Sequence, residues 1–151
     1  MAAEPPVPGR PRDETAGHRT LPHSGDVRIE AWGETREQCL GEAVLGWVDC
    51  FADVSAARAR VVRRVRVPEE SDEDLLATLL EEVVFRFDVH GEVPVDVEVE
   101  TADGDLDVRL AVADADAVPV TGTAPTSVSW SDLRMGRGPY GWTCGVTVAD
   151  D

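Results

Sequence analysis

The chain has 151 residues, of which 30 are acidic and 14 are basic, so its formal net charge is −16 at pH 7. This surplus of negative charge argues against a protein that holds nucleic acid by broad neutralisation of phosphates. It permits the binding of divalent cations or of a basic protein partner. The length suggests one domain.

The N-terminal segment differs in composition from the rest of the chain. Residues 1–20 are rich in Pro, Arg and Glu and contain little that could pack, so we expect a disordered tail there and one domain over residues 21–151. No stretch is apolar and long enough to cross a membrane, and the polar N-terminus does not look like a secretory signal. Three cysteines are too few for a disulfide framework. We therefore expect a cytoplasmic protein with no membrane contact.

The first strand and the first helix are predicted from apolar spacing. Val27, Ile29 and Ala31 alternate with charged residues, as in a half-buried strand. A capping-box spacing then begins at Thr35, and apolar residues at three-four spacing predict a helix over 35–53. Its apolar stripe consists of Leu40, Ala43, Val44, Trp47, Val48 and Phe51. The same spacing favours core packing, rather than ligand stacking, for the two aromatic residues.

A second strand is predicted over 58–67, where the sequence reads RARVVRRVRV. Its five arginines allow two interpretations: a basic strip for RNA or an acidic partner, or a solvated strand face that balances an acidic molecule. We favour the second, because one strip does not overturn the overall charge. A second helix is predicted to start after Ser71 and to end at His90-Gly91, where glycine can adopt the left-handed cap.

The remainder of the chain is predicted to be β structure. Alternating valines over 93–99 lead to Asp103-Gly104, a strong hairpin signal, and a return strand follows over 106–112. Two further strands are expected at about 126–135 and 140–149, joined by residues 136–139. The order β-α-β-α-β-β-β-β predicts an α+β two-layer sandwich, with a mixed β-sheet and two helices packed on one face.

Several motifs of common enzymes are missing from this sequence: it has no Walker A loop, HExxH or paired CxxC. Asp114 and Asp116 superficially suggest calcium, but the EF-hand spacing is absent. Asp26 precedes the first strand, and Asp150 and Asp151 end the chain, with oxygen ligands that suit Ca²⁺, Mg²⁺ or Mn²⁺. On spacing alone, a frayed acidic C-terminus is the simpler interpretation.

Four segments of the chain nevertheless match the motifs of one known protein family. Residues 23–33, HSGDVRIEAWG, resemble an H-T-A-D-[VI]-x-[IL]-x-[AG]-x-G opening. Residues 74–85 are similar to a D-L-L-x-x-W-L-N-E-L-[LIV]-[YF] helix, with Thr78 and Glu81 in place of Trp and Asn. Gly122-Thr123 and residues 128–131 are similar to a G-T-x-x-K-A-[VI]-T-Y-H segment, and Asp150 matches a penultimate Asp. In these motifs the chain resembles the archease family over about 21–151.

The resemblance implies an accessory protein, rather than an enzyme, for an RtcB-type RNA ligase in tRNA splicing and RNA repair. It implies stimulation of the ligase's guanylylation and multiple turnover, without strong direct nucleic-acid binding. It also implies a divalent cation, Ca²⁺ before Mg²⁺ or Mn²⁺, held by the side chains of Asp26 and Asp150 and by a backbone or terminal oxygen of Asp151. Thr126 and Ser131 replace the family's Lys and His, which leaves two interpretations open, a divergent ligase or another client. The alternatives are a general chaperone or modulator of nucleic-acid-modifying enzymes, and a metal-dependent hydrolase.

Overall fold

The computed structural model describes residues 15–23 and 25–149. In chain order its elements are β1 (Gly17–His23), β2 (Asp26–Gly33), α1 (Arg36–Asp49), β3 (Val61–Val67), α2 (Asp72–His90), β4 (Glu92–Ala102), β5 (Asp105–Asp114), the 3-10 turn η1 (Ala115–Ala117), β6 (Ser127–Val128), β7 (Arg134–Gly138) and β8 (Gly141–Ala149). Neither helix is long and apolar enough to cross a membrane.

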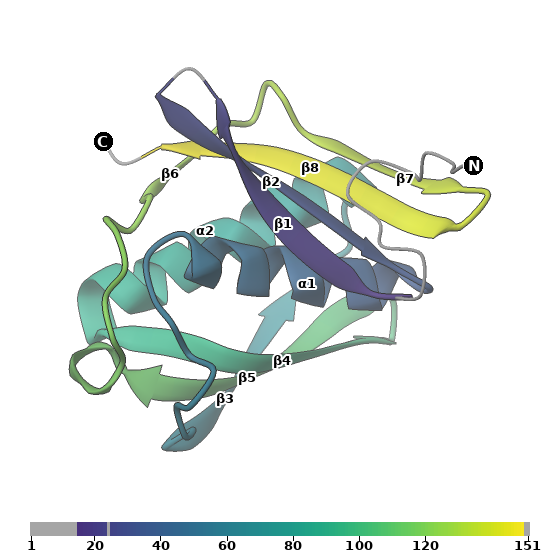
Figure 1. Cartoon of the computed structure of the whole chain (residues 1–151). Helices are drawn as coiled ribbons and strands as arrows, with labels where there is room; N and C mark the ends of the chain where they lie inside the picture. The colour runs from purple at the N-terminus through teal and green to yellow at the C-terminus, as the bar shows by residue number, and fades with distance from the viewer. Residues whose placement is uncertain (1–14, 24, 150–151) are drawn as a thin grey trace.

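The strands form two antiparallel sheets. The first sheet has the order β1-β2-β8-β6, and β7 also pairs with β8, whereas the second sheet has the order β3-β5-β4. The two sheets form the outer layers of the molecule, and both helices lie between them (Figure 1). The α+β class is therefore confirmed, but one mixed sheet with helices on one face was expected and the strands instead divide into two sheets.

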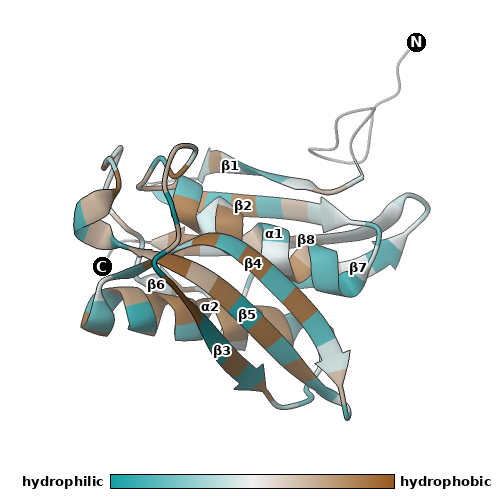
Figure 2. Cartoon of the chain, turned by 90° about the horizontal axis from the view of Figure 1, so that it is seen from below, coloured by the Kyte–Doolittle hydropathy of each residue, from teal (hydrophilic) through white to brown (hydrophobic). Residues whose placement is uncertain are grey.

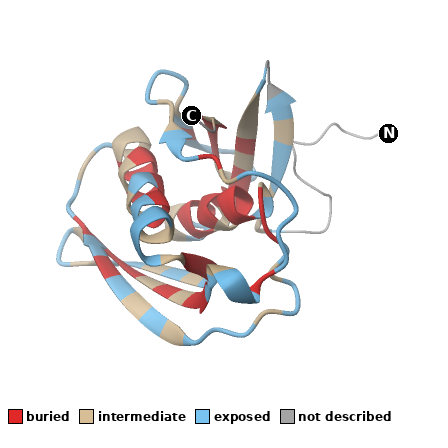
Figure 3. Ribbon diagram, turned by 90° about the vertical axis from the view of Figure 1, so that its left-hand side faces the viewer, coloured by how far each residue is buried: buried red, intermediate tan, exposed pale blue. Residues whose placement is uncertain are grey.

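The composition of α1 explains this division. Apolar and small residues surround most of the helix, and those that are buried are Cys39, Leu40, Gly41, Ala43, Val44, Gly46, Trp47 and Val48. A helix that is apolar on more than one side needs a covering layer on each of those sides. The helix contacts β2 of the first sheet and β4 of the second, and it is buried over most of its surface (Figure 3).

Gly46 allows α1 to approach the first sheet closely. A Cβ atom built on this residue would lie 2.8 Å from Cγ2 of Ile29 on β2, which is closer than carbon atoms pack. On the other side of the helix, a Cβ on Gly41 would meet Val97 of β4 at 3.7 Å, an ordinary contact. The spacing between α1 and the first sheet thus depends on the missing side chain of Gly46.

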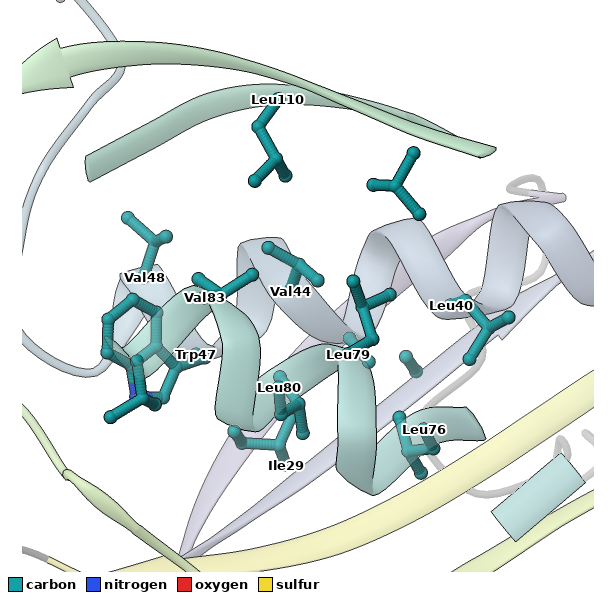
Figure 4. Close-up of a cluster of buried hydrophobic side chains, with 14 of the residues drawn as sticks. Ile29, Leu40, Val44, Trp47, Val48, Leu76, Leu79, Leu80, Val83 and Leu110 are labelled. Carbon is teal, nitrogen blue, oxygen red and sulfur yellow. The ribbon is translucent and has the colours of Figure 1, made fainter. Parts of the chain in front are cut away.

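The main core fills the space between the helices and the sheets (Figure 4). Trp47 and Phe51 are both buried, as predicted, and the two rings pack edge to face with centroids 4.7 Å apart. Phe87 of α2 packs against both of them. The indole Nε1 of Trp47 donates to the carbonyl oxygen of Pro125 at 2.7 Å. The aromatic cluster therefore joins both helices to the segment before β6.

Helix caps and the predicted hairpin form as the sequence indicates. Thr35 accepts a hydrogen bond from the amide of Gln38 at 3.1 Å, and Ser71 accepts one from the amide of Asp74 at 3.3 Å. Gly91 ends α2 with φ +67°. In the turn between β4 and β5, φ is 54° at position 103 and 84° at position 104. Along β4 and β5, apolar and polar residues alternate (Figure 2).

The domain begins earlier than predicted. The sequence places residues 17–20 in the tail, but they belong to β1, which pairs with β2 from Gly17 opposite Trp32 to His23 opposite Asp26. The sequence GHRTLPH has no apolar alternation because β1 is an edge strand that is held mainly by polar contacts. Residues 1–14, the rest of the predicted tail, lie outside the described residues.

The strand predicted over 126–135 is also wrong in detail. It divides into β6 and β7, which pair with different parts of β8, and residues 136–138 belong to β7 rather than to a connection. The loop between them is held by the guanidinium of Arg28, whose Nη1 donates to the carbonyl oxygen of Asp132 at 2.7 Å. A long-range side-chain contact of this kind has no local signal in the sequence.

Candidate functional site

The turn between β1 and β2 positions the predicted ligand Asp26. His23 and Asp26 form the last pair of the β1–β2 ladder, and Gly25 between them has φ +90°, a conformation that favours glycine. Val27 and Ile29 face the core, so strand alternation places Asp26 and Arg28 on the opposite, outer face of the first sheet.

The C-terminal end of β8 lies beside this turn. Val27 pairs with Val148, and the described part of β8 ends one residue later at Ala149. The predicted ligands Asp150 and Asp151 lie outside the described residues. The register thus brings the start of β2 to the end of β8, the two strand ends that the predicted cation would join.

The chemistry of Asp26 fits one ligand of a hard cation. Among the described residues its carboxylate has no ion-pair or hydrogen-bond partner, and carboxylate oxygen is a preferred ligand of Ca²⁺ and Mg²⁺. No group of three or more His, Cys, Asp or Glu residues that could hold a metal occurs in the part of the chain that the structure describes. One carboxylate does not fill the coordination shell of these ions, so further oxygens would come from residues 150–151, from water or from a partner.

A third strand reaches the same end of the first sheet. β6 pairs with β8 through Ser127 opposite Ala149 and Val128 opposite Val148. The exposed Thr126, which stands at the family's Lys position, immediately precedes this pair. Ser131, at the family's His position, lies in the following loop, and its hydroxyl contacts that of Ser129 at 3.1 Å. These two departures from the family pattern therefore lie on the segment that pairs with this end of β8 and on the loop that follows it.

Two exposed aromatic side chains near β6 were not identified from the sequence. Phe85 of α2 is 52% exposed and Trp130 is 46% exposed. The indole Nε1 of Trp130 donates to Oε2 of Glu81 on α2 at 2.8 Å, which fixes the loop after β6 against the helix. A depression of about 500 Å³ beside them is lined by Glu81, Val84, Phe85, Asp88, Thr126, Ser127 and Val128. Phe85 falls outside the apolar stripe of its helix, and that displacement is the signal that could have found it.

The arginine-rich segment 58–67 is not a free basic strip. Nε of Arg63 lies 2.8 Å from Oε2 of Glu92. Nη2 of Arg64 lies 2.6 Å from Oδ2 of Asp107. Arg60 and Arg66 also pair with acids. The interpretation that this strand balances nearby acidic residues is therefore confirmed.

His18 forms a further cluster where β1 meets α1. Its Nδ1 lies 2.8 Å from Oε1 of Glu42, and its Nε2 lies 2.6 Å from Oδ2 of Asp49. Burial lowers the pKa of His18, but the hydrogen bonds and charges of the two carboxylates outweigh burial and raise it above the ordinary value. Through contacts of both ring nitrogens His18 thus attaches β1 to the helix, which is a structural role.

The sequence is similar to those of known proteins. The sequence model of the archease protein family matches residues 18–149. A protein of Mycobacterium tuberculosis named "Probable protein archease" is 43% identical over 134 residues, which cover 89% of this chain and 75% of the relative. A "Protein archease" of Thermococcus gammatolerans is 35% identical over 71 residues, 47% of this chain and 50% of that protein.

Two solved structures share the fold. The solution structure of Methanobacterium thermoautotrophicum protein 1598 covers 88% of this chain and 98% of its own, with a TM-score of 0.71 and 18% identity. The crystal structure of an archease from Thermotoga maritima, described as a possible chaperone, covers 87% and 94%, with a TM-score of 0.58 and 17% identity. At these identities the likeness concerns the fold alone.

Proposed function

This chain belongs to the archease family, and on that premise we propose that it is a metal-binding accessory protein that activates an RtcB-type RNA ligase in tRNA splicing or RNA repair. In this proposal the protein stimulates guanylylation and repeated turnover of the ligase and catalyses no reaction alone. The observation that supports it most directly is the meeting of the start of β2, which carries Asp26, with the end of β8, which leads to Asp150.

The proposed site uses oxygen ligands. Asp26 and Asp150 would hold the cation through their carboxylates, and Asp151 would add a backbone or terminal oxygen. Two carboxylates brought together repel each other without a cation, so binding would link the two strand ends. When bound, the cation supplies positive charge at the edge of a very acidic protein, where a partner could contact it. Ca²⁺ is the first candidate, because it tolerates irregular oxygen sites better than Mg²⁺ does.

Calorimetric titration with Ca²⁺ and with Mn²⁺ tests the metal site. We expect the wild type to bind one of these ions and the Asp26→Asn variant to lose that binding. Asp116→Asn is the matched control, because Asp116 is an exposed acid of η1 without a described contact. Equal binding by wild type and Asp26→Asn would overturn the proposed ligand set, and loss in Asp116→Asn alone would move the site to the loop after β5.

The alternative function, a general chaperone or modulator of nucleic-acid-modifying enzymes, draws on the exposed Phe85 and Trp130. Such a protein would bind unrelated clients whether or not metal is present. Pull-down of a purified cognate ligase in the presence of Ca²⁺ and of a chelator separates the two proposals. Binding of the ligase that requires both the cation and Asp26 favours the ligase accessory function, whereas metal-independent binding of unrelated enzymes favours the alternative.

A further inference from the structure

The outer face of the first sheet carries a depression that the proposed metal site does not use. Its volume is about 310 Å³, and we call it the arginine depression. It is lined by Arg28, Glu30, Ala31, Arg134, Met135, Gly136, Thr143, Cys144 and Gly145. Strands β2, β8 and β7 all contribute to it, so β2 meets two consecutive strands that lie far from it in sequence.

The charges of this depression are unusual for so acidic a protein. Most arginines that the structure describes pair with carboxylates, whereas Arg28 and Arg134 have no carboxylate partner among the described residues. The one acid that lines the depression, Glu30, is already neutralised, because Nη2 of Arg19 lies 2.9 Å from its Oε1. The arginine depression therefore carries a local positive charge.

Arg28 is held in place by neutral groups. Its Nη1 donates to the carbonyl oxygen of Asp132 at 2.7 Å and to Oγ1 of Thr147 at 3.0 Å. A Cβ built on Gly145 would lie 2.5 Å from Nη2 of Arg28, so the guanidinium lies directly against this glycine. The Nε and Nη2 donors have no acceptor among the described residues. A fixed guanidinium with unused donors loses little conformational freedom when it binds an anion.

Arg134 approaches the same glycine from the other side. Glu30 pairs with Gly145, and Gly145 pairs with Arg134, so the three residues form one row across β2, β8 and β7. Gly145 contributes no side chain to the centre of this row, and a Cβ on Gly136 would meet nothing within 4 Å. The two arginines thus flank an open floor, and Thr143 belongs to the same lining.

We propose that the arginine depression binds a single phosphate group, with Arg28 and Arg134 as its charged donors. Arginine donors suit phosphate because its oxygens accept several charge-assisted hydrogen bonds from different directions. The site is compatible with the overall charge, since two local arginines can neutralise one phosphate but not a long polyanion. This inference goes beyond the proposed function and does not depend on the metal at Asp26.

The test is an NMR titration of the full chain in EDTA at low salt, with inorganic phosphate as the first probe. We expect saturable shifts at the Gly145 and Gly136 amides in the wild type, and about tenfold weaker binding in Arg134→Ala, as removal of one charged donor implies. Arg137→Ala is the matched control, because Arg137 is also on β7 without a described partner but does not line the depression. Equal weakening by both variants, or no effect of Arg134→Ala, would overturn the proposal.

Two further probes identify the source of the phosphate. A short RNA with a 5′-phosphate is compared with the same RNA lacking it. Tighter binding of the phosphorylated RNA than of inorganic phosphate supports a site for an RNA end. Equal binding of the phosphorylated RNA and of inorganic phosphate supports a site for a free phosphate compound. Absence of shifts with every probe would contradict the site.

Two more variants separate this site from protein stability and from the metal site. Arg28→Lys keeps the charge but loses the forked donor geometry, so we expect weaker phosphate binding in a protein whose amide spectrum remains folded. Asp26→Asn is expected to bind phosphate in EDTA as the wild type does. Phosphate binding that disappears in Asp26→Asn would show that the two sites are not independent and would overturn the separate assignment.

Discussion

The two sheets of this molecule differ in their ion pairs, although Arg19 and Glu30 do pair on the first sheet. In the second sheet, arginines of β3 pair with acids of β4 and β5 or of the residues that end them, as Arg63 does with Glu92 and Arg64 with Asp107. On the outer face of the first sheet, the structure describes no ion pair for Asp26, Arg28 or Arg134. Charges that a fold leaves unpaired are available to ligands, so the first sheet is where binding is expected and the second mainly supports it.

The largest effect on stability should come from the helices that lie between the two sheets. Trp47→Ala removes a fully buried indole and leaves the carbonyl of Pro125 without its donor. We expect the free energy of unfolding to fall by about 3–5 kcal/mol, as for other large-to-small core changes. Urea unfolding followed by circular dichroism measures this. Val120→Ala, at a residue that is 73% exposed, is the control, and an equally small effect of both changes would contradict the core described above.

The contrast between paired and unpaired charges predicts a smaller difference in stability. Glu92 is buried and contacts both Arg63 and Arg86, so Glu92→Gln should lower the free energy of unfolding by about 1–3 kcal/mol. Arg134→Ala, which breaks no described ion pair, should change it by less than about 0.5 kcal/mol. The same urea experiment compares them. A cost for Arg134→Ala as large as that for Glu92→Gln would mean that the unpaired arginine stabilises the fold.

The attachment of β1 to α1 should depend on pH. The pKa of His18 is raised in the folded protein relative to its ordinary value of 6.5, so its contribution to stability is fully present below that value and is lost as the pH rises through the folded pKa. We expect the stability difference between wild type and His18→Gln to shrink over that window. Thermal unfolding at a series of pH values measures it, and a difference that stays constant would contradict a charged His18.

Thr126→Lys should have the smallest effect on stability and a specific effect on function. Thr126 is exposed, so the change should alter the free energy of unfolding by less than about 0.5 kcal/mol. The change restores the family's Lys beside the proposed metal site, where β2 begins and β8 ends. We therefore expect faster guanylylation of the cognate ligase. The rate of ligase guanylylation with each variant measures this, with Thr123→Lys, also exposed and on the same segment, as the control.

Local patterns predicted the elements whose stability is local. The alternation of Val27, Ile29 and Ala31 and the caps at Thr35, Ser71 and Gly91 all appear in the structure. β1 was missed because its contacts are polar and reach α1 through His18. The division into two sheets was missed because strand pairing between distant segments has no local signal.

The candidate sites also differ in how far the sequence predicts them. Asp26 was found through the resemblance of its motif to a family, since spacing alone favoured an ordinary acidic end. Arg28 and Arg134 could not be found from the sequence, because only the register of β2, β8 and β7 brings them to the two sides of Gly145. The sequence predicts Trp130 on a strand. Its contact with Glu81 joins distant parts of the chain, so it has no local signal in the sequence.

The proposed accessory function depends on Asp26, an unpaired charge of the first sheet. The most direct measurement is guanylylation of the purified cognate RtcB-type ligase in Ca²⁺ with wild type, Asp26→Asn or Asp116→Asn added. We expect stimulation by wild type and by Asp116→Asn, and its loss with Asp26→Asn while that variant remains folded. Full stimulation by folded Asp26→Asn would contradict the account.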